Sequence, residues 1–437
     1  MKRALSLAAL LLAAGCAHYT PLPLPTAPPL AQALPAMPSA PLTVEQVAAL
    51  AVERNPDLIA ARARRGVAQA QLVQAGVLPN PSLAGAFLPL ISGAGAVPAW
   101  NVGITQDIKA LIVYKPKVRA ARDSARQVDA DLLWQEWQTA GQARQLAVDL
   151  ILEQRNIAEL RRAYDLLSHR KDVAEKALAQ HDITLMTASP SLTAYQSARA
   201  NLQAADEHRL ELRHKLNALL ALAPDAIVPL VDRIDIPPLD PAAIRSGIAT
   251  LPDRRPDLLA LRLGYAAADK NLRVAILSQF PDLVLGGQAQ SDSSKVINIG
   301  PQATIGLPVF DRNQGNVAIA RATRAQLNAE YAARLASITG EVGALLAEWE
   351  KLSAQLETVK ADLPQAKSAA DRAAAAFGRS ALDERSYIDL ITTYFAKEQE
   401  IMTLETALRE REVAIDTLIG AGLPTVATLP SMPEKRR

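Results

Sequence analysis

Two pairs of short segments alternate apolar and polar residues. Trp100, Val102, Ile104 and Ile108 are separated by polar or small residues, and the segment from 297 to 309 repeats the pattern. A period of two is the spacing of a β-strand with one apolar face. The sequence therefore predicts strands at about 82–90, 99–109, 282–291 and 297–309, joined in pairs by Gly-rich or Ser-rich loops.

Long segments after the strands have a different period, with apolar residues spaced by three and four. The seam of the second half comprises Ile338, Val342, Leu345, Trp349, Leu352, Leu356, Val359 and Leu363. A returning helix carries Leu390, Tyr394, Ile401, Leu404, Leu408, Ile415 and Leu418. Such heptads are typical of left-handed coiled coils. We expect a helix from about Asn316 to Phe377, bent or locally opened at Pro364.

The first half has a weaker version of the same seam. It comprises Leu146, Leu150, Ile157, Leu160, Tyr164 and Leu167, and a returning helix is expected from Ala198 to Leu222. The two halves are also related in sequence at an offset of 200 residues. Pro56, Asp57, Leu58, Ala60 and Arg62 return as Pro256, Asp257, Leu258, Ala260 and Arg262. The chain is thus predicted to contain two homologous repeats, 42–237 and 238–424.

Each repeat is expected to begin with a helix before its strands. Thr43 and Gln46 have the spacing of a capping box at the start of the first one. That helix is expected to continue to about Gly76, with a break or kink at Pro56.

The N-terminus has the pattern of an export signal. Lys2 and Arg3 precede an apolar run that ends in "LLAAGC", which resembles a bacterial lipobox. We expect residues 1–15 to be a cleaved signal peptide, Cys16 to be lipidated, and 16–41 to be a proline-rich tether. Residues 425–437 form a polar tail. A plain secretory signal with an incidental cysteine is the alternative.

Composition narrows the class of protein. Of the residues, 49% are hydrophobic but only 4% aromatic, and the net charge is +2. This favours closely packed helices and gives no indication of nucleic acid as a partner. The chain has no nucleophile motif, no phosphate-binding glycine loop and no paired metal signature, so we predict no enzyme activity, no cofactor and no metal site. His208 and His214 are six residues apart and do not share a helix turn.

Four strands cannot span a membrane as an isolated sheet. Strands of roughly ten residues have the required length, but open edges in lipid leave backbone groups unpaired, and the smallest common barrels need about eight strands. Either several chains share one barrel, or the strands form a small soluble sheet that caps the helices. The sequence pattern leaves both possibilities open.

Several motifs in their order resemble the TolC-like outer-membrane efflux proteins, particularly the lipoprotein members. These are the doubled "NPDL" and "RPDL" helices, "PNPSL" before the first strand, "GLPVFDRNQG" after the fourth, and "AAAAFGRSALDERSYIDL" at the end of the heptad helix. The resemblance covers Leu42 to about Pro424. It implies a mainly α protein with a membrane β-barrel part. The protein would be a homotrimer in which each chain gives four strands to a 12-stranded barrel and its helical hairpins to a periplasmic α-barrel.

The resemblance also implies a function and partners. The channel would conduct passively through the outer-membrane lipid, served by a periplasmic adaptor of the membrane fusion type and an inner-membrane resistance-nodulation-division pump. Small toxic molecules such as drugs are the expected cargo, with metal cations or secreted polypeptides as alternatives. A lipid-anchored periplasmic coiled-coil structural protein is the alternative of another class.

The tips of the helical hairpins are the expected periplasmic gate and adaptor-facing surface. The second tip spans Phe377 to Tyr387: Gly378 matches the family glycine, and Asp383 with Glu384 lies near its acidic position. Arg379 or Arg385 could latch a neighbouring helix. In the first tip, His181 or Asp182 occupies the glycine region and Thr187 the acidic position. For all of these charges, a solvated tip without a gating role is the alternative.

Overall fold

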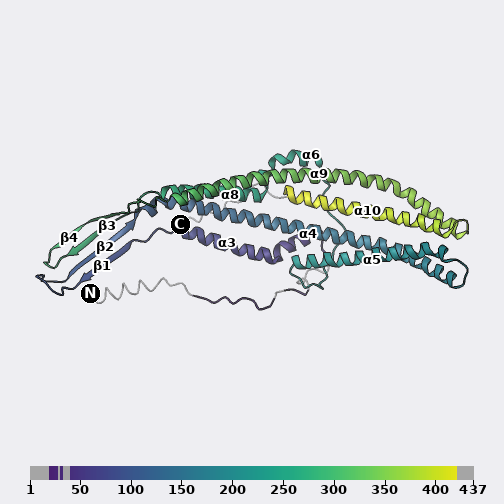
Figure 1. The fold of residues 1–437 in the computed structure, drawn as a ribbon, viewed down its shortest axis with the longest axis horizontal. Helices are drawn as coiled ribbons and strands as arrows, with labels where there is room; N and C mark the ends of the chain where they lie inside the picture. Colours follow the sequence, from purple (N-terminus) through teal and green to yellow (C-terminus); the bar gives the residue numbers. More distant parts are fainter. Residues whose placement is uncertain (1–18, 28–29, 33–39, 421–437) are drawn as a thin grey trace.

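The strands and the hairpin tips lie at opposite ends of a long molecule (Figure 1). The computed structural model describes residues 19–27, 30–32 and 40–420. The predicted signal peptide, Cys16 and the polar tail lie outside these residues.

The sheet has four antiparallel strands in the order β1-β2-β3-β4. Their bounds are Ser82–Leu88, Ala99–Asp107, Leu283–Ser291 and Ile297–Ile305. The predicted strand pairs are confirmed, but the first, second and fourth strands end earlier than the predicted residues 90, 109 and 309, and Ile108 is already the first residue of the helix that follows β2. Ile305 pairs with Leu283, the first residue of β3, so the chain beyond it has no strand to pair with.

The two faces of the sheet differ in polarity. One face carries Leu83, which is opposite Ile104, and Ala289, which lies between Val102 and Ile299. The other face carries amide rows such as Asn101, Gln290 and Asn298. The apolar face is uncovered: Ile299 is 83% exposed and Leu83 is 77% exposed. The outer edges of β1 and β4 pair with no other described strand.

The two long helices follow the two strand pairs. Helix α4 spans Ile108–Ala179 (72 residues) and α9 spans Gln314–Gly378 (65 residues). The returning helices are α5, Leu185–Leu219, and α10, Glu384–Ile419. The expected start of the first returning helix at Ala198 is therefore too late. Helix α9 continues through Pro364 without a break. Among the described residues, no helix is both long enough and apolar enough to cross a membrane.

The heptad seams are largely confirmed as the core. Ile338 and Val342 of α9 pack with Ile415 of α10 in one buried cluster. Two positions differ from prediction: Leu346 rather than Leu345 is fully buried, and Leu390 is 37% exposed. Helix α9 packs against both α8 and α10, so its buried face is wider than the seam of a two-stranded coiled coil.

Shorter helices precede each strand pair. In the first repeat these are α2, Val44–Arg54, and α3, Pro56–Ala75. The predicted capping box of Thr43 and Gln46 is present, and the helix breaks at Asn55, so Pro56 is the first residue of α3. In the second repeat, α6 (Pro241–Gly247), η1 (Ile248–Thr250) and α7 (Leu251–Arg254) precede α8 (Pro256–Leu277).

An extended N-terminal segment packs along the middle of the molecule. Ala31 forms a parallel bridge with Leu222, and Leu42 forms one with Leu230. Leu42 is buried in the same cluster as Val47 of α2. This layer covers α4 at mid-length, because α2 packs directly on that helix.

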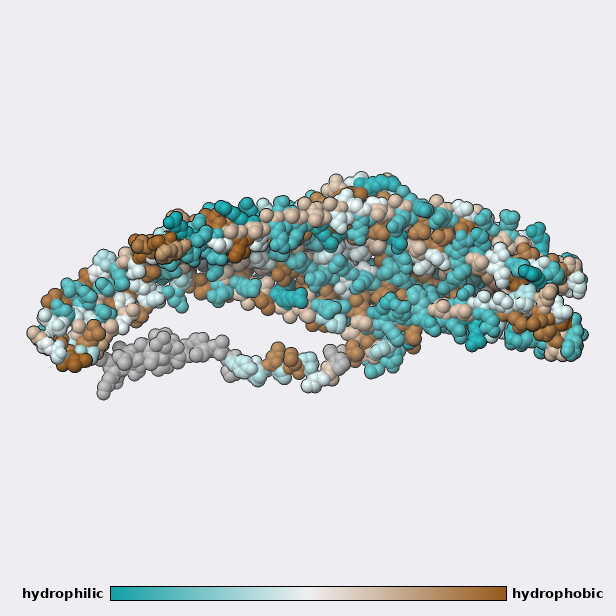
Figure 2. All heavy atoms as spheres, in the orientation of Figure 1, coloured by the Kyte–Doolittle hydropathy of each residue, from teal (hydrophilic) through white to brown (hydrophobic). Residues whose placement is uncertain are grey.

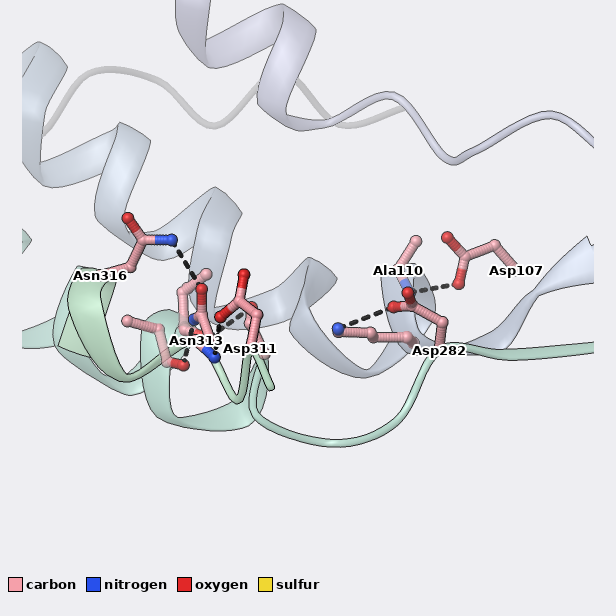
Figure 3. Close-up of polar contacts among 10 residues, drawn as sticks. Asp107, Ala110, Asp282, Asp311, Asn313 and Asn316 are labelled. Carbon is pink, nitrogen blue, oxygen red and sulfur yellow. Dashed lines mark hydrogen bonds and ion pairs between the residues drawn. The ribbon is translucent and has the colours of Figure 1, made fainter. Parts of the chain in front are cut away.

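Polar side chains cap the long helices where they begin, next to the strands (Figure 3). Helix α4 begins directly after β2, where Asp107 Oδ1 accepts a hydrogen bond from the Ala110 backbone N–H at 2.9 Å. Lys109 Nζ lies 2.8 Å from Asp282 Oδ1, which joins α4 to the chain before β3. These contacts fix the direction in which the long helix leaves the sheet.

The second transition uses an asparagine in the left-handed region. Asn313 has φ 59° and donates from Nδ2 to the Ala275 carbonyl at 2.8 Å. Asp311 accepts from the Asn313 backbone N–H, and Asn316 donates to Asn313 Oδ1 (Figure 3). Asparagine tolerates positive φ better than most residues, and its amide also secures α8 against the start of α9.

Candidate functional site

The two hairpin tips lie together at the end opposite the strands (Figure 1). Residues 180–184 connect α4 to α5, and 379–383 connect α9 to α10. A buried cluster joins all four helices just behind the tips. Its members are Leu167, Ala198, Ala370, Ala373, Tyr387, Ile388 and Ile391.

Both tips end their first helix with the same backbone geometry. His181 has φ 62° and Ser380 has φ 57°. The next residue in each tip, Asp182 or Ala381, donates its N–H back to the preceding helix at 2.9 Å. This is the hydrogen-bond pattern of a helix C-terminus closed by a left-handed residue.

Gly378, which matches the family glycine, lies just before the left-handed turn of the second tip. Gly378 is the last residue of α9, and the left-handed residue is Ser380, two positions later. A Cβ added to Gly378 would meet no atom within 4 Å. The backbone of this tip does not require glycine at 378.

The residues after each turn cap the returning helix. Asp383 accepts from the Ser386 N–H at 2.9 Å and from the Ser386 hydroxyl at 2.7 Å. These hydrogen bonds, the backbone one first, lower the pKa of Asp383. Thr184 holds the same position in the first tip and caps α5. The expected equivalence of Thr187 with the acidic position is therefore wrong, because Thr184 is the structural counterpart of Asp383.

Glu384 has a different role from Asp383 although the two are adjacent. Its Oε2 lies 2.6 Å from Arg170 Nη2 of α4, and its Oε1 accepts from the Ser191 hydroxyl of α5. The side chains of Arg170 and Glu384 are only 16% and 11% exposed. One carboxylate of the second hairpin thus binds both helices of the first hairpin.

Aromatic rings complete this contact. The guanidinium of Arg170 lies 4.4 Å from the centre of the Phe377 ring and 5.5 Å from that of Tyr387. The two rings stack with centroids 4.7 Å apart. Burial raises the pKa of Tyr387, whose residue is 7% exposed. A partly desolvated ion pair against aromatic faces is stronger than a surface pair.

The remaining predicted residues do not join this cluster. Arg379, Arg385, His181 and Asp182 are exposed and form no side-chain hydrogen bond or ion pair within the described chain. The sequence pattern did not point to Arg170 and Ser191, which are 214 and 193 positions from Glu384. One feature of the sequence could have indicated Arg170. It follows Leu167 by three residues and so places a charged residue at the next position of the apolar seam.

A groove of about 790 Å³ runs beside the tips between α5 and α10. Met186, Pro190 and Ala194 line it from α5, and Arg385 and Phe395 line it from α10. No group of three or more His, Cys, Asp or Glu residues that could hold a metal ion occurs in the part of the chain that the structure describes.

Comparison with known proteins relates these features to a family. Residues 248–421 match the family model described as outer membrane efflux protein. The chain matches no curated protein in sequence. The description of this family agrees with the predicted class of protein, an outer-membrane channel.

Solved structures share the fold over nearly the whole length. A structure of CusC is 19% identical with a TM-score of 0.70 and covers 93% of this chain and 100% of its own. VceC of Vibrio cholerae is 17% identical with a TM-score of 0.71, over 87% of this chain and 96% of its own. The Campylobacter jejuni CmeC channel is 16% identical with a TM-score of 0.71, over 88% and 86%. Residues 248–421 thus match the outer membrane efflux protein family, and the chain as a whole has the fold of the TolC-like outer-membrane channels.

Proposed function

We propose that three copies of this chain form a passive outer-membrane channel of a tripartite efflux system. The observation that carries the proposal is the four-stranded sheet, which has an uncovered apolar face, a polar face and two open edges. Only a closed barrel satisfies such edges in lipid. Three chains with four strands each give twelve strands, with the apolar face toward lipid and the amide rows toward the lumen.

The helices continue the same arrangement away from the membrane. Each protomer contributes the α4–α5 and α9–α10 hairpins to a helical tunnel in the periplasm. The Arg170–Glu384 pair holds the two hairpin tips of one protomer together and keeps the narrow end closed. The groove beside α5 and α10 is the surface that we assign to the periplasmic adaptor, with a resistance-nodulation-division pump behind it.

The cargo is proposed to be small toxic molecules such as drugs. The face assigned to the barrel lumen carries neutral amides and small residues, which discriminate little between chemical classes. Metal-cation export and polypeptide secretion are therefore alternatives that the following experiment must distinguish from drug efflux. A deletion strain, with and without a plasmid copy, is tested against antibiotics, dyes, detergents and salts of copper, zinc, cobalt and silver.

Each outcome of that test has one meaning. Complemented sensitivity to varied organic compounds supports drug efflux, whereas sensitivity confined to metal salts moves the assignment to cation export. The channel itself is tested separately with purified protein. Heat-sensitive trimers in detergent and single-channel conductance in planar bilayers are expected, and their absence would favour the lipid-anchored structural protein.

Cys16 is proposed to carry the lipid anchor of the mature chain. Ala31, whose bridge to Leu222 joins the tether to the rest of the molecule, is fifteen positions after Cys16. An extended chain of that length spans at most about 50 Å. Mass spectrometry of the mature N-terminus is expected to show an acylated Cys16, and Cys16→Ser should remove the acyl mass. An unmodified Cys16 or cleavage at another residue would reject the anchor.

A further inference from the structure

One face of α4 changes from apolar to basic as the helix leaves the strands. Leu111 and Ile112 are 40% and 47% exposed. They are followed on the same face by Lys115, Arg119, Arg122 and Arg126, which we call the basic stripe. Its spacings of four, three and four residues keep these side chains on one side of the helix. All four are exposed and form no ion pair or side-chain hydrogen bond within the described chain.

The charge around the stripe is not balanced locally. Between Lys109 and Arg126 the chain has six basic residues and one acidic residue, Asp123. Asp123 is engaged by Lys270 of α8, and Lys109 is engaged by Asp282. The charges that remain without a partner are therefore positive.

The stripe faces away from the tunnel axis. Helix α4 contacts α3 through the Tyr114 hydroxyl, which donates to the Gly76 carbonyl, and contacts α8 through Asp123. Arg144 is 18 residues after Arg126, which is five helical turns, so both lie on the same side. Arg144 binds Glu45 of α2, in the layer that covers α4 at mid-length. A tunnel lumen could not accommodate that layer, so this side of α4 is the outer one.

The depth of the stripe relative to the strands is also defined. Lys115 is eight residues and Arg119 twelve residues beyond Asp107, the last residue of β2, or about 12 and 18 Å along the helix. Other exposed apolar residues gather at the same junction, including Leu307 (80%) and Phe310 (93%), and Figure 2 shows this as a brown patch between the strands and the helices. An apolar band followed by basic side chains is the order of groups across a lipid interface.

We propose that Lys115 and Arg119 bind the headgroups of anionic phospholipids in the inner leaflet of the outer membrane. The inference rests on the proposed function, since it takes the exposed apolar residues at the strand ends, as far as Ile112, as the membrane boundary. In a trimer the stripe is repeated three times around the channel. Clustered lysine and arginine next to a membrane attract anionic lipid within about one Debye length, near 10 Å. Lys115 and Arg119 are about 4 and 10 Å beyond Ile112 along the helix, whereas Arg122 and Arg126, about 15 and 21 Å beyond it, are outside this range.

The test measures lipid selectivity with spin-labelled phosphatidylglycerol and spin-labelled phosphatidylcholine. The protein is reconstituted in phosphatidylcholine vesicles, and the relative association of the two labels is measured by electron paramagnetic resonance. The wild type is expected to prefer phosphatidylglycerol about three- to fivefold. The double variant Lys115→Gln/Arg119→Gln should lower the ratio toward 1, and about 0.5 M salt should do the same in the wild type.

Two matched variants separate position from charge. Lys117 lies between Lys115 and Arg119 along the helix, but two residues from each, which places it on the opposite side of the helix. Lys117→Gln should leave the preference for phosphatidylglycerol intact. Arg122→Gln/Arg126→Gln removes two positive charges, as the test variant does, from the same side of the helix but farther from the strands. This variant should retain most of the preference for phosphatidylglycerol. Equal ratios in the wild type and the Lys115/Arg119 variant would overturn the proposal. So would an equal loss in the Lys117 variant.

Conductance separates this proposal from the channel itself. The Lys115/Arg119 and Arg122/Arg126 variants are expected to conduct in planar phosphatidylcholine bilayers, because neither changes a lumen or tip residue. If wild-type protein forms neither trimers nor channels, the proposed function fails. If channels conduct normally without any preference for phosphatidylglycerol, only the lipid site is rejected.

Discussion

Arg255 donates a hydrogen bond from Nη1 to the carbonyl oxygen of Leu418 at 2.5 Å. The matching residue of the first repeat, Asn55, donates from Nδ2 to the carbonyl of Leu219 at 3.2 Å. In both halves, the residue before the "PDL" helix thus binds the last turn of the returning helix. The duplicated motif closes each repeat, which explains why it occurs twice.

Arg255 is expected to be essential for folding of the second repeat. It is 0% exposed, it binds both carboxylate oxygens of Asp257, and it lies 4.2 Å from the centre of the Trp134 ring. Burial alone would raise the pKa of Asp257, but Arg255 and Arg334 hold it low. Arg255→Ala should lower the free energy of unfolding by about 3–5 kcal/mol, because the carboxylate of Asp257 loses the buried one of its two arginine partners.

The control for that variant is Arg334→Ala. Arg334 binds the same carboxylate at 2.9 Å, but its side chain is 43% exposed. Its loss should cost less than about 1 kcal/mol. Thermal unfolding followed by circular dichroism measures both variants, and an equal effect of the two would refute the role given to burial.

Gly141 is predicted to be required by a close helix crossing. A Cβ added there would lie 2.5 Å from Thr417 Oγ1 and 2.6 Å from Thr417 Cγ2, so α4 and α10 could not keep their distance. Gly141→Ala should cost about 1–3 kcal/mol through overpacking. Thr417→Ala in the same chain should restore most of the loss, since it removes both of these atoms. Failure of this rescue in a double-mutant cycle would show that the contact is not the cause.

Much of this architecture could be predicted from local sequence patterns. The strand pairs, the hairpins and the capping box of Thr43 follow from period and spacing, which depend on neighbouring residues only. The 200-residue offset also indicated which segments are equivalent. Predictions failed where a segment distant in sequence decides the outcome. Leu346 is buried in a cluster that includes Ile244 of α6 and Leu251 of α7, and β4 ends at Ile305 because its partner Leu283 is the first residue of β3.

The tip cluster could not be predicted in the same way. Asp383 and Glu384 are adjacent acidic residues, yet one caps a helix and the other binds Arg170 across the hairpins. The second role depends on a residue 214 positions away. The left-handed turn residue is not indicated by the sequence either, because Ser380 adopts a positive φ that glycine would adopt at less cost.

Asp416 predicts a specific dependence of stability on pH. Burial raises its pKa to about 6; Glu412 and Glu45 add to the effect, and Arg144 opposes it. Between pH 4 and 6 the unfolded carboxyl ionises while the folded one keeps its proton, so stability falls as the pH rises through this window. Asp416→Asn removes this ionisation. The decrease in the free energy of unfolding over this pH range should therefore be smaller in the variant by about 1 kcal/mol, a figure that allows for partial solvent screening. Unfolding midpoints at pH 4.5 and 7.5 measure the difference. An unchanged pH slope in the variant would contradict the assignment.

Glu384 is predicted to hold the periplasmic end closed. Its carboxylate is the polar group that binds Arg170 of α4 and Ser191 of α5 to α10, so Glu384→Ala should free the two hairpin tips from each other. The expected result is a severalfold rise in single-channel conductance, together with greater sensitivity of cells to large antibiotics that enter through open channels. Asp383→Ala is the matched control. It removes the neighbouring carboxylate, which only caps α10, and should not open the channel. If both variants conduct like the wild type, the Arg170–Glu384 pair has a structural role at the tip and the gate must depend on contacts between protomers.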